Sequence, residues 1–123
     1  MNDKANQLEE RLVDFAVLIL GVVESLPDTR IGNHIAGQLV RCGTSPGPNY
    51  GEAQSAESRN DFIHKMKVAL KELRETLIWL KIIIRKGLGP SEDLAPILQE
   101  NDELISIFVT SVKTAQHNRN DGR

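Results

Sequence analysis

The sequence has a single cysteine and few aromatic residues. Because Cys42 is the only cysteine among 123 residues, the chain can form no intramolecular disulfide and no zinc site built on cysteines. Aromatic residues make up 4% of the chain, so Leu, Ile, Val and Ala supply most of its apolar side chains. Charged residues make up 26%. This composition favours helices packed through aliphatic side chains over a β-sandwich, and it predicts an all-α protein.

Long apolar runs are also missing. The longest run, FAVLILGVV at residues 15–23, lies between Asp14 and Glu24. A membrane-spanning helix needs about 20 apolar residues, and the acidic residues before this run do not match a signal peptide. The sequence therefore predicts a soluble, cytoplasmic protein with no membrane partner.

The chain as a whole has no large excess of charge of either sign. Its formal net charge is −2, which argues against a general polyanion binder. The charges are nevertheless unevenly distributed, because residues 1–28 carry six acids and two bases, whereas residues 60–87 carry three acids and seven bases. Residues 88–123 are acidic again. One internal segment is thus basic, and both terminal segments are acidic.

Apolar residues recur at spacings of three and four along four segments, which is the period of an amphipathic helix. We expect helices over about residues 5–26, from 28 or 29 to about 43, over 58–86, and from 91 or 93 onward. Ser58 is the expected N-cap of the third helix, and Gly87 its left-handed C-cap. Ser91 or Asp93 is the expected N-cap of the fourth helix, with Pro96 in its first turn. The expected core residues are Leu8, Leu12, Phe15, Ile19, Val22, Leu26, Ile31, Ile35, Leu39, Cys42, Ile63, Met66, Leu70, Leu73, Leu77, Leu80, Ile84, Leu94, Leu98, Ile105, Phe108, Val112 and Ala115.

Four helices joined by short turns predict one domain, an antiparallel up-down-up-down four-helix bundle over residues 1–118. The polar residues 119–123 are expected to form a disordered tail. Asn101 falls on the apolar row of the fourth helix. We expect Asn101 to face water near a helix end, the alternative being a core position where it fixes the register of the helices.

The stretch RCGTSPGPNYGEA, residues 41–53, interrupts the helical pattern. Pro46 and Pro48 lack the amide hydrogens that a continuous helix needs, so we expect a kink at the end of the second helix. Asn49, followed three residues later by Glu52, predicts the N-cap of a short helix that runs to about residue 56. Glu52 is expected to support this cap or to pair with Arg41 or Arg59.

This stretch and the helix after it resemble the four helix bundle protein family, also known as the large-subunit rRNA intervening-sequence protein family. The family motif Ser-x-x-x-Asn-(Ile or Tyr)-x-Glu-(Ala or Gly) is matched by Ser45, Asn49, Tyr50, Glu52 and Ala53. A following helix with an Ala-Leu-x-Glu-(Leu or Ala)-x-Glu pattern is matched by Phe62, Ala69, Leu70, Glu72, Leu73 and Glu75.

The resemblance implies an antiparallel bundle that assembles into a ring, commonly a pentamer, with no established catalytic activity. It also implies a link to nucleic acid. Some members are encoded inside intervening sequences of rRNA genes, and a structurally similar accessory protein of diversity-generating retroelements binds nucleic acid and a reverse transcriptase.

Two apolar rows exceed what a single bundle core needs. They are Val13, Val17 and Leu20 in the first helix, and Ile78, Trp79 and Ile82 in the third. Surplus rows of this kind are typical of subunit interfaces, so we expect self-association through them. The alternative is that both rows pack into the bundle itself.

A row of basic residues follows one flank of the third helix: Lys67, Lys71, Arg74, Lys81 and Arg85, here called the basic stripe. Several cations on one face could contact a run of phosphates in RNA or DNA. The favoured interpretation is pairing with acids of another helix or subunit, such as Glu10, Asp14, Glu100 and Glu103.

No residue pattern indicates catalysis or metal binding. Asp61 and His64 stand one turn apart, but a di-iron bundle needs matching carboxylates from the other helices, and no second such pair exists. His34 and His117 have no neighbours in sequence that suggest a triad, and Cys42 has no evident base. We therefore expect no enzyme activity, cofactor, metal or small-molecule substrate. The predicted function is a homo-oligomeric scaffold, and the alternative is an accessory protein that binds nucleic acid or a nucleic-acid enzyme through the basic stripe.

Overall fold

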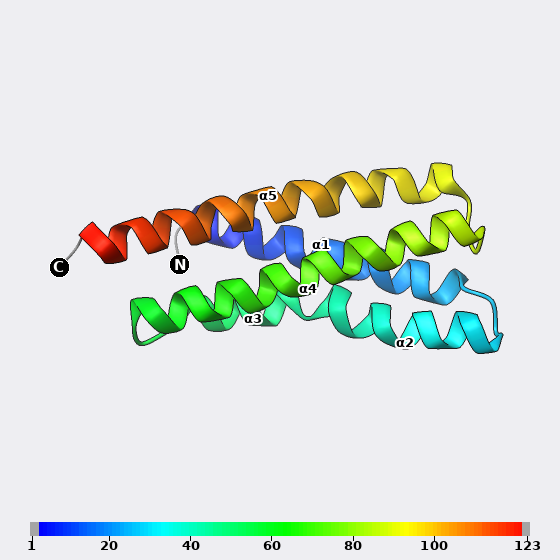
Figure 1. Ribbon diagram of the computed structural model, residues 1–123, viewed down its shortest axis with the longest axis horizontal. Helices are drawn as coiled ribbons and strands as arrows, with labels where there is room; N and C mark the ends of the chain where they lie inside the picture. Colours follow the sequence, from blue (N-terminus) through cyan, green and yellow to red (C-terminus); the bar gives the residue numbers. More distant parts are fainter. Residues whose placement is uncertain (1–2, 122–123) are drawn as a thin grey trace.

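The computed structural model describes residues 3–121, and the side chains of residues 3–118 (Figure 1). The helices are α1 (Asp3–Ser25), α2 (Arg30–Thr44), α3 (Pro46–Gln54), α4 (Arg59–Lys86) and α5 (Ser91–Asp121). No strand occurs in the described residues. The all-α prediction is therefore confirmed.

The helices form an elongated antiparallel four-helix bundle in which α2 and α3 follow one another along a single corner (Figure 1). Both α1 and α4 pack against α2, α3 and α5, whereas the backbones of α1 and α4 do not approach each other closely in the described part of the chain. These two helices therefore occupy diagonal corners of the bundle. They also run in the same direction, as an up-down-up-down order requires.

A single residue, Ser45, separates α2 from α3. Pro46 is the first residue of α3, where its fixed φ angle suits a helix start and its missing N–H costs nothing. The predicted N-cap at Asn49 is wrong, because Asn49 lies inside α3. Its Nδ2 donates to the Ser45 carbonyl and to the Ser45 Oγ, at 3.0 and 2.8 Å. The proline at the helix start, rather than the Asn-x-x-Glu pattern, decides where the helix resumes.

The helix ends largely follow their sequence signals. Thr29 Oγ1 accepts from the Gly32 N–H, and Ser58 Oγ accepts from the Asp61 N–H, both at 3.0 Å. Gly87 ends α4 with φ at 76°, a conformation that only glycine adopts without strain. These caps confirm the predicted ends of α2 and α4.

The start of α5 differs from its prediction. The Pro90 carbonyl accepts the first helical bonds from Asp93 and Leu94, so neither Ser91 nor Asp93 is the cap. Pro96 consequently lies in the second turn rather than the first. It is exposed there, so water can satisfy the carbonyl that loses its helical donor.

The core contains most of the expected residues, with Phe15, Leu39, Leu73 and Phe108 fully buried. One expected core residue, Ile31, is 52% exposed, because α2 turns its buried face through Gly32 and Ile35 instead. Buried residues that were not among those expected include Ala69, Thr76, Ile83, Ile97 and Leu104. They show that α4 and α5 bury broader faces than a strict alternation of three and four residues indicates.

Asn101 is fully buried between α5 and α4, so the expectation that it faces water is wrong. Its Nδ2 donates to the Leu73 carbonyl of α4 at 3.0 Å. Its Oδ1 is buried without a hydrogen-bond partner in the described part of the chain. The polar contact holds α5 at one height along α4, which is the register role that the sequence left as an alternative.

Helices α1 and α2 approach most closely beside Gly43. A Cβ atom at this position would come 2.5 Å from Ile19 Cγ2, a distance that no packed side chain tolerates.

The C-terminal residues were expected to form a disordered tail from residue 119 onward. The backbone of residues 119–121 instead continues α5. Residues 122–123 of the expected disordered tail lie outside the described residues.

Candidate functional site

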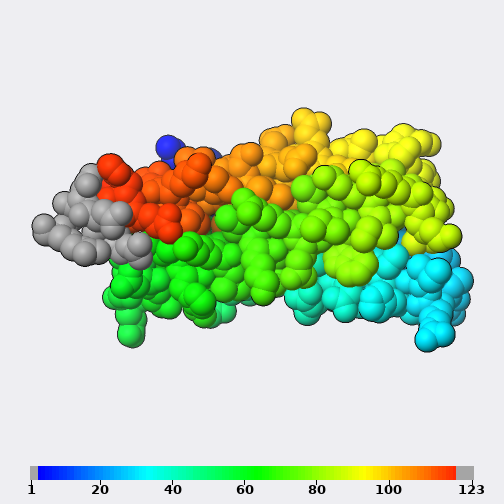
Figure 2. Space-filling view, viewed as in Figure 1, coloured from blue at the N-terminus to red at the C-terminus, as the bar shows by residue number. Residues whose placement is uncertain are grey.

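All five residues of the basic stripe are exposed on α4. At 3.6 residues per turn, they share an arc of about 100° with two exposed isoleucines, Ile78 and Ile82. In Figure 2, α4 forms a continuous band along the side of the molecule that faces the viewer, between α2 and α5. The predicted nucleic-acid site and part of the predicted oligomer interface therefore lie on one surface. We call these seven residues the α4 outer face.

No cation of the basic stripe has an acidic partner among the described side chains. Two of the acids considered for this role, Glu100 and Glu103, instead bind Arg11 of α1, with Nη2–Oε1 distances of 2.6 and 3.3 Å. Within the described part of the chain, acids of the other helices therefore do not neutralise the basic stripe. Its pairing with another subunit stays a prediction.

Ion pairs that involve α4 lie at its borders with α2 and α3. Arg41 of α2 contacts Glu72 and Glu75 at 2.8 and 2.6 Å, and the Glu72 side chain is almost completely buried. The hydrogen bond to Glu75, followed by the charges of Glu72 and Glu75, raises the pKa of Arg41, so the guanidinium keeps its charge. These two glutamates belong to the family pattern, and their contacts here join helices.

The remaining motif residues surround the start of α3. Glu52 pairs with Lys65 of α4 at 2.8 Å, so its predicted partners Arg41 and Arg59 are wrong. Tyr50 is buried and meets the Phe108 ring edge-on, with centroids 5.9 Å apart. Burial and the charge of Glu9 raise the pKa of its hydroxyl, so Tyr50 remains neutral. The motif stabilises the contact of α3 with its neighbours and gathers no reactive groups.

The surplus apolar row of α1 is exposed, with Val13 at 48%, Val17 at 62% and Leu20 at 41%. Val13 and Val17 line a shallow hollow of about 380 Å³ together with Gly47 and Pro48 of α3. The acids Glu10 and Glu24 lie on the same arc of the helix, and Asp14 borders it; all three are exposed. We call these six residues the α1 outer face, whose charge is opposite to that of the α4 outer face.

Trp79 lies apart from the other members of its predicted row. It is half-buried, and His34 of α2 meets its ring edge-on with centroids 5.9 Å apart. Ile78 and Ile82, by contrast, are 58% and 40% exposed. The indole therefore helps to join α4 to α2, while its part in an oligomer interface stays a prediction.

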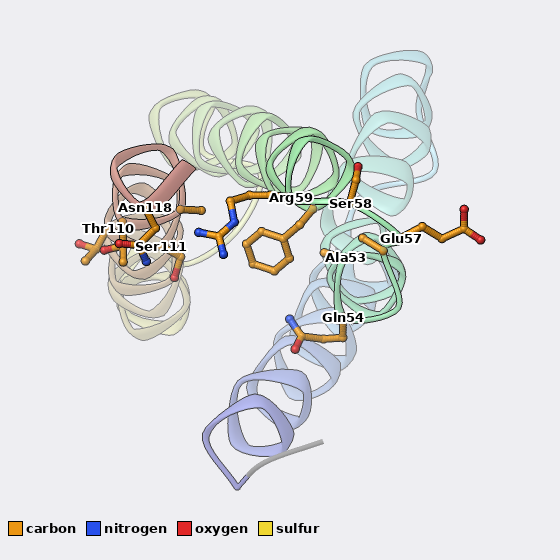
Figure 3. A pocket seen from close by; sticks show the side chains of 12 residues that line it. Ala53, Gln54, Glu57, Ser58, Arg59, Thr110, Ser111 and Asn118 are labelled. Carbon is orange, nitrogen blue, oxygen red and sulfur yellow. The ribbon is translucent and has the colours of Figure 1, made fainter. Parts of the chain in front are cut away.

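A cavity of about 710 Å³ opens where α3, the start of α4 and the end of α5 meet (Figure 3). Figure 3 shows the Arg59 guanidinium directed toward Ser111 and Asn118 of α5, while Glu57 points away from the cavity. Arg59 is the one cation and Glu57 the one acid among the described lining residues, and the other polar side chains are hydroxyls and amides. Such a lining offers hydrogen bonds but no nucleophile paired with a base.

Groups able to carry chemistry are not brought together elsewhere in the described residues. No three His, Cys, Asp or Glu side chains there converge as metal ligands would. Cys42 is buried, and burial raises the pKa of its thiol, so it is a poor nucleophile. In the described part of the chain, no helix is both long and apolar enough to cross a membrane.

Comparisons with known proteins agree with this architecture. The sequence model of the family described as 23S rRNA-intervening sequence protein matches residues 4–110. A crystal structure of a protein with unknown function, from the S23 ribosomal protein family of Bacteroides thetaiotaomicron, superposes with a TM-score of 0.81 at 33% identity. The match covers 86% of this chain and 98% of that one.

The search of curated proteins gave no match. The family match nevertheless spans four of the helices and most of α5, including the Ser45–Ala53 motif and both glutamates that bind Arg41. By sequence and by fold, this chain belongs to the 23S rRNA-intervening sequence protein family.

Proposed function

We propose that this protein is a non-enzymatic, cytoplasmic module that works as a homo-oligomeric ring and serves as a scaffold for a partner. One observation carries the proposal: apolar rows on α1 and α4 remain exposed although the bundle core is already filled. The ring, and a pentamer as its expected size, rest on the resemblance to the family.

The exposed rows are difficult to explain in a monomer. Val17 and Ile78 are each more than half exposed, and neighbouring Val13, Leu20 and Ile82 extend both rows along their helices. Burial of apolar surface contributes about 25 cal/mol per Å², so covering these rows in an interface would be favourable. Single exposed leucines are common on soluble proteins, whereas ordered rows on two helices are typical of interaction surfaces.

Light scattering coupled to size exclusion tests self-association directly. At micromolar concentration, we expect a mass several times that of one chain, and at a high salt concentration the apolar contacts should persist. A monomer under both conditions would contradict the proposal. Circular dichroism of the same samples confirms that the helices are intact.

A second candidate function is binding of nucleic acid through the basic stripe. The exposed, unpaired cations favour it, because Lys67 and Arg85 lie about 27 Å apart along α4 at 1.5 Å per residue. A stripe of that length could follow several phosphates. A nucleic-acid enzyme, such as a reverse transcriptase, is the partner that the family resemblance adds.

Fluorescence anisotropy with labelled RNA and DNA at two salt concentrations tests the second candidate. Backbone binding should weaken steeply with salt, and Lys71→Gln with Lys81→Gln should lower the slope by roughly two ion equivalents. Lys65→Gln is a matched control, because Lys65 already pairs with Glu52 outside the stripe. Absence of binding at low salt would eliminate this function.

A further inference from the structure

We propose that the α1 outer face of one copy packs against the α4 outer face of the next copy, so that each subunit uses two different surfaces. This inference rests on the proposed self-association and names the surfaces that form the contact. The occupant of the α4 outer face is therefore a second copy of this chain.

The two faces are complementary in charge. The α4 outer face carries five exposed cations, and the acid at its border, Glu75, is bound to Arg41. The α1 outer face carries Glu10 and Glu24, with Asp14 at its border, and no base. The nearest bases on α1 do not neutralise it, because Arg11 is turned toward α5 and bound to Glu100. Each face also has apolar side chains among its charges. Contact between two α1 faces, or between two α4 faces, would bring like charges together, which disfavours a symmetric pairing.

The charged and apolar positions also match in height along the bundle. Ile83 of α4 lines the same hollow as Leu18, Gly21 and Val22 of α1, which places residue 83 level with about residue 21. Because α1 and α4 run parallel with the same rise per residue, an offset of about 62 relates their levels within roughly one turn.

Within this tolerance of one turn, three positions of the α1 outer face lie level with complementary positions of the α4 outer face. They are Glu10 with Lys71, Val17 with Ile78, and Glu24 with Arg85. In a ring whose axis runs along the bundle, neighbouring copies meet at equal heights. The complementary positions therefore face one another without any sliding of the subunits.

The placement of the two faces suits this assembly. Since α1 and α4 occupy diagonal corners and turn only their buried sides toward each other, both outer faces are available on the same subunit at the same time. A contact between two different surfaces is heterologous, and it generates a ring when the rotation between copies closes. The opposite charges supply orientation, and the valine and isoleucine rows supply buried apolar area.

Two single substitutions test the contact. Val17→Glu replaces an apolar side chain of the α1 outer face with a carboxylate that the contact would bury opposite Ile78. Ile78→Glu places a carboxylate against the acids of the neighbouring α1 outer face. Both residues are exposed, so neither change should disturb the fold. We expect each variant alone to have the mass of one chain. An equimolar mixture should form a heterodimer of twice that mass, because each variant still has the one intact face that the other needs.

Ile31→Glu is the matched control. Ile31 is 52% exposed on α2, outside both faces, so this variant should keep the wild-type mass. Circular dichroism spectra of all three variants should match that of the wild type. The two monomeric variants should still melt cooperatively, at or below the wild-type temperature, because they lack the subunit contact.

The outcomes separate the inference from the proposed function. A monomeric wild type contradicts self-association itself. If the wild type is oligomeric but each variant forms a dimer on its own, only the inference is contradicted. Such dimers would require a symmetric contact through the one face that each variant keeps. Unchanged masses for both variants contradict it as well. If the variants are monomeric and their mixture stays monomeric, the two faces do not bind each other, and the inference is wrong.

RNA binding provides an independent outcome. If the α1 outer face covers the basic stripe, the intact ring should bind RNA at least tenfold more weakly than the Val17→Glu monomer, whose stripe is uncovered. Equal or tighter binding by the intact ring, lost when Lys71 and Lys81 are replaced by glutamine, would overturn the inference. Those lysines cannot be covered by a neighbour and free for phosphates at once.

Discussion

The inner and outer faces of α4 carry similar aliphatic side chains in opposite environments. Leu73 is fully buried, whereas Ile78, five residues later, is 58% exposed. The acidic residues at the inner border bind Arg41, while the cations of the outer face have no partner among the described side chains. The kind of residue therefore does not distinguish the core of α4 from its exposed surface. The position of a residue around the helix axis determines whether it is buried, because the bundle can cover only the side that faces α2, α3 and α5.

Truncation of a side chain on the inner face should have the largest effect. Leu73→Ala should lower the free energy of unfolding by about 2 to 5 kcal/mol, because it leaves a cavity in a closely packed core. Ile78→Ala removes a similar side chain from the outer face and should change the stability of the monomer by at most about 0.5 kcal/mol. Urea titrations of both variants in a monomeric Val17→Glu background measure the difference. Equal losses would show that the outer face belongs to the bundle core.

A buried charge on the inner face should have the next largest effect. Asn101→Asp places a carboxylate beside the Leu73 carbonyl and should lower the free energy of unfolding by about 3 kcal/mol at neutral pH. Burial raises the folded-state pKa of such a carboxyl above its unfolded value. The variant is therefore relatively most stable at low pH and loses that stability as the pH rises.

Stability curves of Asn101→Asp and wild type between pH 3 and 8 should therefore converge at the acidic end. Asn101→Leu is the matched control, since it removes the unpaired oxygen without adding a charge. A deficit of Asn101→Asp that is independent of pH would show that the side chain escapes to water.

The charged groups give a smaller contrast between the two faces. Arg41→Met leaves the buried Glu72 carboxylate without its partner, so it should destabilise the fold. In the monomeric Val17→Glu background, where no neighbour covers the basic stripe, Lys71→Met removes an unpaired, exposed cation and should leave the melting temperature nearly unchanged. Differential scanning calorimetry of both variants measures the contrast. If Lys71→Met destabilises as much as Arg41→Met, the stripe has partners within the chain.

Several features of the fold were predictable because they depend on local chemistry. Thr29 and Ser58 cap the starts of α2 and α4 through their side-chain oxygens, and Gly87 ends α4 in the left-handed conformation that glycine allows. The exposed rows on α1 and α4 could also be recognised, since they exceed what one core needs. The start of α3 was predicted wrongly, because two local signals, Pro46 and Asn49, compete within four residues, and only packing shows which one prevails.

The long-range contacts had no sequence signal. Nothing in the spacing of Arg41, Glu72 and Glu75 indicates that they meet, because the residues lie 31 and 34 positions apart. The burial of Asn101 was likewise hidden, since the same pattern fits a solvent-facing asparagine. The spacing of Ile78 and the basic stripe in the sequence already places them on one arc of the helix. Whether that arc is exposed, however, depends on where the other helices pack.

Sequence patterns alone were enough for four amphipathic helical segments, the caps at Thr29, Ser58 and Gly87, and the family motif; the break before α3 was expected, but not its position at Ser45. Each of these follows from the preferences of residues a few positions apart. Only the tertiary structure decided that α1 and α4 stand at diagonal corners, that Asn101 is buried and that the basic stripe has no partner among the described side chains. Those outcomes depend on which faces the bundle covers, and that choice arises from packing all of the helices together.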